Sequence, residues 1–330
     1  MHLALRRPLM LSALALAATI GCNPAGSEVQ CQLDRDCASG VCLANGTCAP
    51  DNGGSGGSAG TGGSGDQDAA DDSAAGAAGA AGAAGAASDA GDDGSTGVCA
   101  PNHDGVITRD EIPLQAGLHA TYKIATNTQW DTAGQPQSGG TRSWDLSGSF
   151  SGDHSSLIET LALDGLWFAP DFPNATYASR LSDTQTLLGV FQLTNDQLLL
   201  LGIASPDSGV TQTKLTYDPP VVVLQFPFQK GSTWESTSTV SGTASGIASY
   251  YTEKYANQVD ATGTMKTPFG TFDVLRVGVV LTRTIGVMPT TIRQYLFATE
   301  CFGTVAAVTS QDNEQQVEFT QIKELKRLSP

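Results

Sequence analysis

The chain alternates apolar and polar residues with the two-residue period of β-strands from residue 99 to its end. Short runs rich in Val, Ile, Leu, Thr, Tyr and Phe stop at Gly, Pro, Asn or Asp, whereas a helical period is hard to find. Strands are expected at residues 118–126, 141–150, 156–163, 186–194, 197–204, 210–217, 221–226, 232–242, 257–266, 271–285, 290–298, 303–310 and 315–325. The stretch TND at 194–196 predicts a hairpin turn.

The connections between these runs are too short for parallel crossovers, which need a dozen residues or more. We therefore predict an all-β domain at 99–330 with an antiparallel, curved sheet, either a half-barrel or barrel-like. The stretch 271–285 places apolar residues on both of its faces, which indicates a central strand covered on two sides. Leu275, Val277, Val279 and Leu281 share one face, and Phe272, Val274 and Val280 share the other.

The first residues have the layout of a secretory signal. Arg6 and Arg7 precede an apolar run from Leu9 to Ile20, which is too short for a membrane-spanning helix of about 20 residues. The ending TIGC resembles the lipobox of bacterial lipoproteins, and this resemblance implies a signal peptide at 1–21, cleavage before Cys22 and acylation of its thiol. Asn23 then favours the outer membrane or cell surface over the inner membrane. The alternative is an ordinary cleaved signal with an incidental cysteine.

Three further regions precede the β domain. Residues 22–30 would form the lipidated N-terminus, and residues 31–48 hold four cysteines, Cys31, Cys37, Cys42 and Cys48. An exported segment this small needs cross-links for its order, so we expect disulfides; a zinc site is the alternative, although the CxxC pairs that zinc favours are missing. Residues 49–98 are rich in Gly, Ala, Ser and Asp and predict a disordered linker, which spans roughly 35–42 Å as a flexible coil of about 50 residues. The Cys-rich stretch at 31–48 resembles short Cys-rich segments of lipoproteins from delta-proteobacteria, especially myxobacteria.

The two remaining cysteines, Cys99 and Cys301, lie in the β domain and are expected to pair in an oxidising compartment, although six cysteines allow other pairings. The chain carries 33 acidic and 17 basic residues and a net charge of −16. An acidic surface repels phosphate backbones, so no nucleic-acid partner is expected. The only expected membrane contact is the lipid anchor.

Three stretches in the second half of the domain resemble a pattern found in bacterial lipoproteins and periplasmic proteins with a curved antiparallel sheet. They are FPFQKGSTWESTSTVSG (226–242), KTPFGTFDVLRVGVVLTRTI (266–285) and YLFATECFGTV (295–305). The resemblance implies a fold similar to that of the lipoprotein-carrier superfamily, whose half-barrels hold an acyl chain. The matching positions are Pro227, Gly231, Trp234, Pro268, Gly270, Phe272, Arg276, Val277, Tyr295, Phe297, Ala298, Gly303 and Val305.

The stretch NHDGVITRDE at 102–111 resembles a calcium loop of the EF-hand or dockerin type. With Gly105 at the invariant glycine position, the resemblance implies five calcium ligands, Asn102, Asp104, Val106, Thr108 and Glu111. Ala100 stands where the family has an aspartate, so at most a weak calcium site is expected. The alternative is a turn made by Asp104 and Gly105 without an ion.

No motif of a known catalytic type stands out, and we expect no enzyme and no resident cofactor. His103, His119 and His154 are the histidines after the signal, and neighbours on a strand such as Asp153, His154 and Ser155 alternate faces and cannot form a relay. An acid–base pair among the carboxylates remains open. The leading hypothesis is a lipid-anchored, non-enzymatic envelope or surface protein that binds a small apolar ligand or a partner protein. The alternatives are a structural module without a pocket and a calcium-modulated surface protein.

Overall fold

A computed structural model describes residues 99–183 and 186–330. The predictions for the signal peptide, for Cys22, for the cysteines from Cys31 to Cys48 and for the linker lie outside these residues. Within them, no helix is long and apolar enough to cross a membrane.

The described residues form strands and three short 3-10 helices, and no α-helix is found among them. The strands are β1 (Val106–Ile107), β2 (His119–Gln129), β3 (Gln135–Pro136), β4 (Arg142–Asp145), β5 (His154–Leu161), β6 (Tyr177–Arg180), β7 (Leu188–Leu193), β8 (Gln197–Ala204), β9 (Lys214–Gln225), β10 (Phe228–Gln229), β11 (Thr233–Ala244), β12 (Ile247–Lys266), β13 (Thr271–Ile285), β14 (Met288–Thr299), β15 (Gly303–Ser310) and β16 (Gln321–Leu328). The 3-10 helices are η2 (Arg109–Glu111), η3 (Ser138–Gly140) and η4 (Ala169–Asp171).

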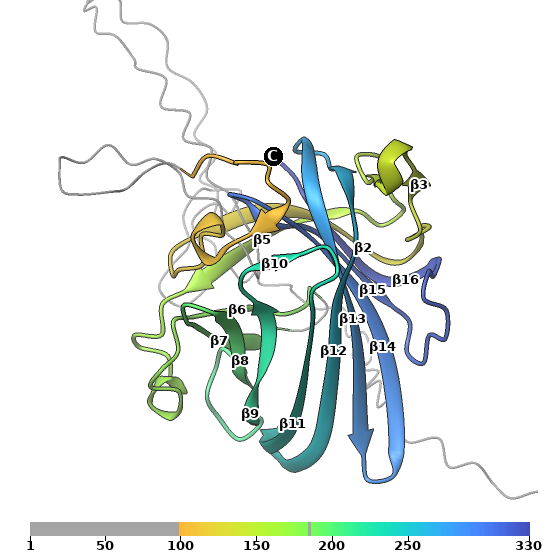
Figure 1. Ribbon diagram of the computed structural model, residues 1–330. Helices are drawn as coiled ribbons and strands as arrows, with labels where there is room; N and C mark the ends of the chain where they lie inside the picture. The colour runs from red at the N-terminus through yellow and green to blue at the C-terminus, as the bar shows by residue number, and fades with distance from the viewer. Residues whose placement is uncertain (1–98, 184–185) are drawn as a thin grey trace, which may run out of the picture. The chain divides into compact units, whose positions relative to one another are not determined.

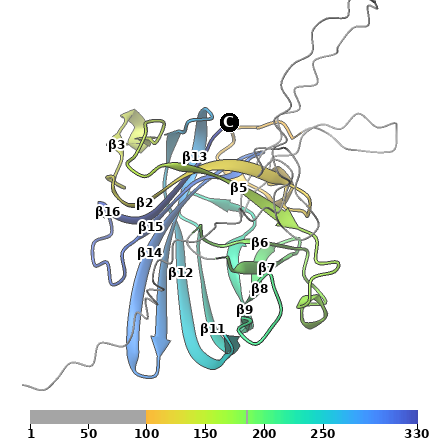
Figure 2. The same ribbon diagram turned by 180° about the vertical axis from the view of Figure 1, so that it is seen from behind.

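The main sheet closes on itself into a ring (Figures 1 and 2). Its order is β11, β9, β8, β7, β6, β5, β2, β16, β15, β14, β13 and β12, and β12 pairs again with β11, which makes twelve antiparallel strands. The two ends of the domain are neighbours in the sheet, because β2 near the start of the domain pairs with the last strand, β16. The predicted all-β class with an antiparallel, curved, barrel-like sheet is confirmed.

One pairing is parallel, which the expectation from short connections did not foresee. β4 runs parallel to the last residues of β12, from Gly263 opposite Arg142 to Lys266 opposite Asp145. The long stretch between these two strands leaves ample chain for the crossover. Gly263 allows the close approach, because a Cβ at this position would clash with the carbonyl oxygen of Arg142.

Several strand boundaries differ from the prediction. The expected strands 210–217 and 221–226 form one strand, β9. Its pairing with β8 is irregular between Leu200 and Gly202, opposite the two prolines in the middle of β9, and this irregularity lets the strand continue past them. β12 begins ten residues earlier than predicted, and β16 begins six residues later. The strands at 197–204, 271–285 and 303–310 have the predicted bounds.

The two faces of β13 contact two different cores, as its pattern predicted. Leu275, Val277 and Val279 belong to the cluster inside the ring. Val274 belongs to a second cluster on the outer face. There the segment 130–150, which we call the arm, covers the sheet with Trp144 and Leu146.

A buried guanidinium links the outer face of β13 to its cover. Arg276 donates to Asp260 on β12, to the Thr132 carbonyl of the arm and to Glu318 in the loop before β16, over distances of 2.7–3.0 Å. Its guanidinium also lies 4.1 Å from the ring centre of Tyr295. Charge-assisted contacts of this kind hold both covering segments against the sheet.

Candidate functional site

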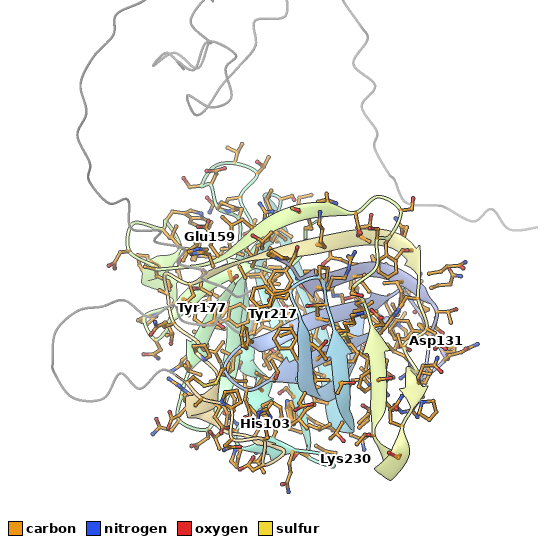
Figure 3. The ribbon with its side chains drawn as sticks, turned by 90° about the horizontal axis from the view of Figure 1, so that it is seen from above. His103, Asp131, Glu159, Tyr177, Tyr217 and Lys230 are labelled. Atoms are coloured by element: carbon orange, nitrogen blue, oxygen red, sulfur yellow. A yellow bond between two sulfur atoms is a disulfide. The ribbon has the colours of Figure 1, made fainter. Side chains whose placement is uncertain are left out.

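The segment 99–117, which we call the plug, lies at the upper end of the ring in Figure 1. Ile107, Ile112 and Leu114 are buried in the cluster inside the ring, and β1 pairs with β10 above it. Three apolar side chains in a segment without long strands explain why it packs inward rather than remaining on the surface. Tyr177 and Tyr217 lie inside the same ring when it is seen from above, whereas Asp131 lies on the outside (Figure 3).

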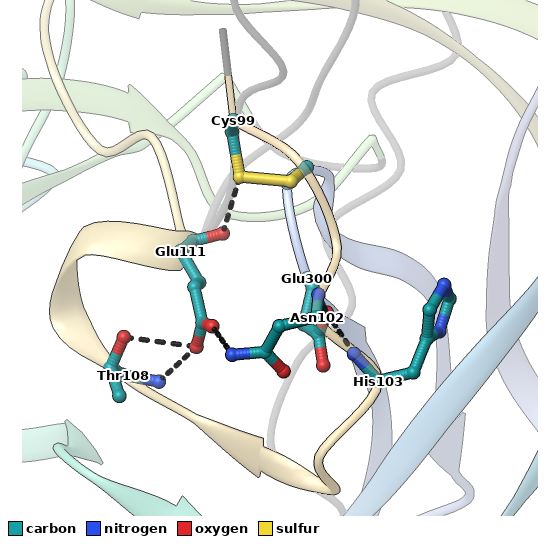
Figure 4. The surroundings of a disulfide bond; sticks show 7 residues. Cys99, Asn102, His103, Thr108, Glu111 and Glu300 are labelled. Atoms are coloured by element: carbon teal, nitrogen blue, oxygen red, sulfur yellow. Dashed lines mark hydrogen bonds between the residues drawn. A yellow bond between two sulfur atoms is a disulfide. The ribbon is translucent and has the colours of Figure 1, made fainter. Parts of the chain in front are cut away.

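The plug is fixed to the turn between β14 and β15. Cys99 and Cys301 form a disulfide, as predicted (Figure 4). Next to it, the Cys301 amide donates to the Glu111 carbonyl at 2.7 Å. Glu300 accepts hydrogen bonds from the amides of Asn102 and His103 at 2.7 and 3.1 Å. These contacts join the start of the domain to a late strand through both covalent and polar bonds.

The predicted calcium loop is a hydrogen-bonded turn within the plug (Figure 4). One carboxylate oxygen of Glu111 accepts from the Asn102 side-chain amide at 2.7 Å, and the other accepts from the amide and hydroxyl of Thr108 at 2.8 and 2.9 Å. Asp104 accepts from the Val106 amide at 2.7 Å.

The donor set fits calcium poorly, because both oxygens of Glu111 already have protein partners and Ala100 supplies no carboxylate. Among the described residues, no group of three or more His, Cys, Asp or Glu side chains could hold a metal ion. Calcium binding at Asn102, Asp104, Val106, Thr108 and Glu111, which the resemblance implies, is thus untested, and the hydrogen bonds of Glu111 argue against it.

An open cleft of about 980 Å³ lies beside the plug. Its walls come from the plug, from the arm around β4, from the hairpin between β12 and β13, and from the turn after β14. The polar lining includes Gln137, Arg142, Thr262, Thr264 and Thr271. A volume of this size matches the clefts in which proteins hold small ligands.

Three phenylalanines form an aromatic wall in this cleft. Phe272 and Phe302 lie 5.1 Å apart in an edge-to-face arrangement, and Phe269 stacks on Phe272 at 6.2 Å. Phe269 is partly exposed at 38%, although burial of a phenylalanine is favourable by roughly 1.5–3 kcal/mol. The wall thus presents apolar area that the protein itself leaves uncovered.

A polar pair lies at the edge of the same cleft. The imidazole Nδ1 of His103 lies 3.3 Å from a carboxylate oxygen of Asp273, and both side chains are well exposed. Glu300 also lines the cleft but is buried and engaged with the plug. The cleft therefore combines an apolar wall with hydrogen-bonding groups of both kinds at its edge.

Only part of this site was found from the sequence. His103 and Gly105 of the predicted loop line the cleft, as does Phe272 of the resemblance pattern. Phe269 and Phe302 were not singled out, and they come together only through the hairpin and the turn after Cys301. Trp234 of the resemblance pattern is buried in the core and donates to the Val222 carbonyl at 3.1 Å.

The histidine on β5 forms no catalytic relay with its sequence neighbours. One ring nitrogen of His154 lies 2.6 Å from Asp183 and the other lies 3.3 Å from the Gly152 carbonyl. Asp153 instead binds Arg327. With both ring nitrogens engaged, His154 has none left to activate a nucleophile.

No known protein family, no curated protein and no solved structure matches the chain. The resemblances drawn from the sequence therefore stay predictions.

Proposed function

We propose that the protein is a lipid-anchored, non-enzymatic protein of the bacterial envelope or cell surface, and that its β domain binds a small, largely apolar ligand in the cleft beside the plug. The observation that carries this proposal is the wall of Phe269, Phe272 and Phe302 in an open cleft of about 980 Å³. The lipid anchor at Cys22 is supported by the signal-like N-terminus and the TIGC stretch.

The chemistry of the cleft favours an apolar ligand with a polar end. Flat apolar groups gain about 0.5–1.5 kcal/mol from a well-placed aromatic contact, beyond the area that they bury. His103 and Asp273 at the edge of the cleft suit a hydroxyl or amide group on the ligand. A strongly anionic ligand is disfavoured because Asp273 lies at the edge of the cleft and the whole chain is acidic.

The proposal is tested by titrating the full chain carrying Cys22→Ser, which removes the proposed acyl chains, with N-phenyl-1-naphthylamine, an uncharged dye whose fluorescence rises in apolar surroundings. We expect saturable binding of one dye per chain. Phe302→Ala removes part of the wall and should weaken binding about tenfold. Thr264→Trp fills the cleft from an exposed position of β12 and should abolish binding without removing a core side chain.

Leu157→Ala is the matched control, because Leu157 is an exposed apolar residue on β5 outside the cleft. Equal binding by the wild-type chain and Thr264→Trp would overturn the cleft proposal and favour the structural module without a pocket. The anchor is tested separately: mass spectrometry should find acyl chains on Cys22 and none in Cys22→Ser.

A further inference from the structure

The end of the ring opposite the plug carries most of the exposed large apolar side chains. Six of the nine such residues described in the protein lie on three neighbouring tips, and this concentration at one end is unlike the scatter of an ordinary soluble surface. We call these six residues the rim: Val210, Ile247, Tyr250, Ile285, Val287 and Met288, with exposed fractions from 60% to 95%.

The rim belongs to connected strands, so its parts lie at one end. The turn between β11 and β12 and the turn between β13 and β14 are both at the lower end in Figures 1 and 2. Thr252 of β12 pairs with Thr284 of β13, and both tips extend beyond this level. Measured along the strands from this pair, β12 continues for about four residues more than β13, or roughly 13 Å at about 3.3 Å per residue.

The third tip is the loop between β8 and β9, which carries Val210. Hydrogen bonds hold it against the turn between β11 and β12. The amide of Gly246 donates to the Gln212 carbonyl at 3.1 Å, and the Ser245 amide donates to the Thr213 hydroxyl at 3.0 Å. Gly246 is required here, since a Cβ at this position would clash with the Val210 carbonyl. Val210 and Ile247 are therefore presented together.

The rim contains no charge in an otherwise acidic chain. Residues 208–213, 236–252 and 284–292 hold no Asp, Glu, Lys or Arg. Among the charges that flank these stretches, Glu235 pairs with Lys254 at 3.0 Å, Glu253 with Arg283 at 2.6 Å and Lys214 with Asp171 at 2.7 Å. Between the apolar residues stand Ser and Thr hydroxyls, and Tyr250 has the amphipathic ring that favours the boundary between water and lipid.

We propose that the rim is a docking surface for the uncharged, zwitterionic surface of a lipid bilayer, into which the three tips insert shallowly. A protein partner fits less well, because stable protein interfaces need about 20–30 residues a side on matching surfaces, whereas the rim consists of separate projecting turns. The acidic chain without rim cations also disfavours anionic lipid. The docking is independent of the proposed acyl anchor and of the cleft.

The test uses the full chain with Cys22→Ser, which removes the proposed acylation site, and sedimentation with phosphatidylcholine vesicles. We expect binding that persists at high salt and weakens when phosphatidylglycerol is added. Val287→Asp with Met288→Asp should reduce binding by about tenfold or more, because two charges would enter the lipid boundary. The matched control is Val317→Asp, which changes an exposed valine outside the rim.

Each outcome decides the proposal. Absence of vesicle binding by the unacylated chain would overturn it, as would equal binding by the rim variant and the wild-type rim. If size-exclusion chromatography instead shows self-association that the rim variant abolishes, without vesicle binding, the surface joins copies of the chain and the lipid proposal is wrong. Urea unfolding of the variants confirms that the aspartates leave the fold intact.

Discussion

The carboxylate of Glu253, fully buried inside the ring, accepts a hydrogen bond of 2.6 Å from Nε of Arg283 on the neighbouring strand. The hydroxyl of Tyr255 donates to the same carboxylate at 2.7 Å. Burial disfavours the charge on Arg283, but attraction to Glu253 and their hydrogen bond outweigh it and raise the pKa of the guanidinium. Burial and nearby Tyr217 and Glu253 raise the pKa of Tyr255.

Removing the arginine should leave a buried carboxylate without its partner. We expect Arg283→Met to lower the free energy of unfolding by about 3 kcal/mol, measured by urea denaturation. The control is Lys254→Met, because Lys254 pairs with the exposed Glu235 and its loss should cost about 0–1 kcal/mol. Equal effects of the two substitutions would contradict the structural role of the buried pair.

The disulfide should make a large contribution to stability, because Cys99 and Cys301 are separated by 202 residues. In the chain-entropy account, closing a loop of this length stabilises the fold by up to about 5 kcal/mol. The double substitution Cys99→Ser with Cys301→Ser should lower the urea midpoint. Reductant should lower the wild-type midpoint to the same value and leave that of the double variant unchanged; a wild-type midpoint insensitive to reductant would contradict this prediction.

The pair of His154 and Asp183 predicts a pH dependence of stability. Hydrogen bonds to Asp183 and to the Gly152 carbonyl raise the pKa of His154 above its ordinary value of 6.5. The raised pKa means that the charged histidine stabilises the fold fully below about pH 6.5 and that this contribution is lost as pH rises through the folded-state value. Burial raises the pKa of Asp183, but its hydrogen bonds and the nearby charges outweigh this and lower it below 3.8, so this group stays charged over the same interval.

Urea midpoints of the wild-type chain and His154→Gln should therefore differ most near pH ~5.5 and converge by pH ~8.5. His119→Gln, which removes an exposed imidazole from β2, controls for the loss of a histidine elsewhere. A difference between wild type and His154→Gln that stays constant across this interval would show that the imidazole acts without its charge.

The plug predicts no response to calcium, because Thr108 and Asn102 already occupy both oxygens of Glu111. Calorimetric titration of the full chain with millimolar calcium should produce no binding heat. Heat that disappears in Glu111→Gln would contradict this expectation and would support the alternative of a calcium-modulated surface protein.

The sequence predicted the strands whose inward positions are apolar along most of their length. β13 is such a strand, and its bounds and its two buried faces agree with the pattern. The first half of β12 was missed because Glu253 occupies an inward position, and this residue becomes compatible with burial only through Arg283 on the next strand. Polar residues paired across strands cannot be recognised from one strand alone.

Closure of the ring and the cleft depend on contacts between distant residues. The pairing of β2 with β16 joins the two ends of the domain, and no local pattern specifies it. The turn-like composition at 102–111 was evident, but its place above the ring follows from burial of Ile107, Ile112 and Leu114. Phe302 is a single aromatic residue after Cys301, and nothing in its local sequence indicates a site. It contacts Phe272 only in the folded domain.

Native mass spectrometry of the Cys22→Ser chain, which lacks the proposed acyl anchor and can be purified from its producing cells without detergent, is the sharpest test of a small apolar ligand in the cleft beside the plug. We expect one additional apolar molecule per chain, released on unfolding and absent from Thr264→Trp. A chain that carries no such molecule, or a molecule retained equally by Thr264→Trp, would contradict it.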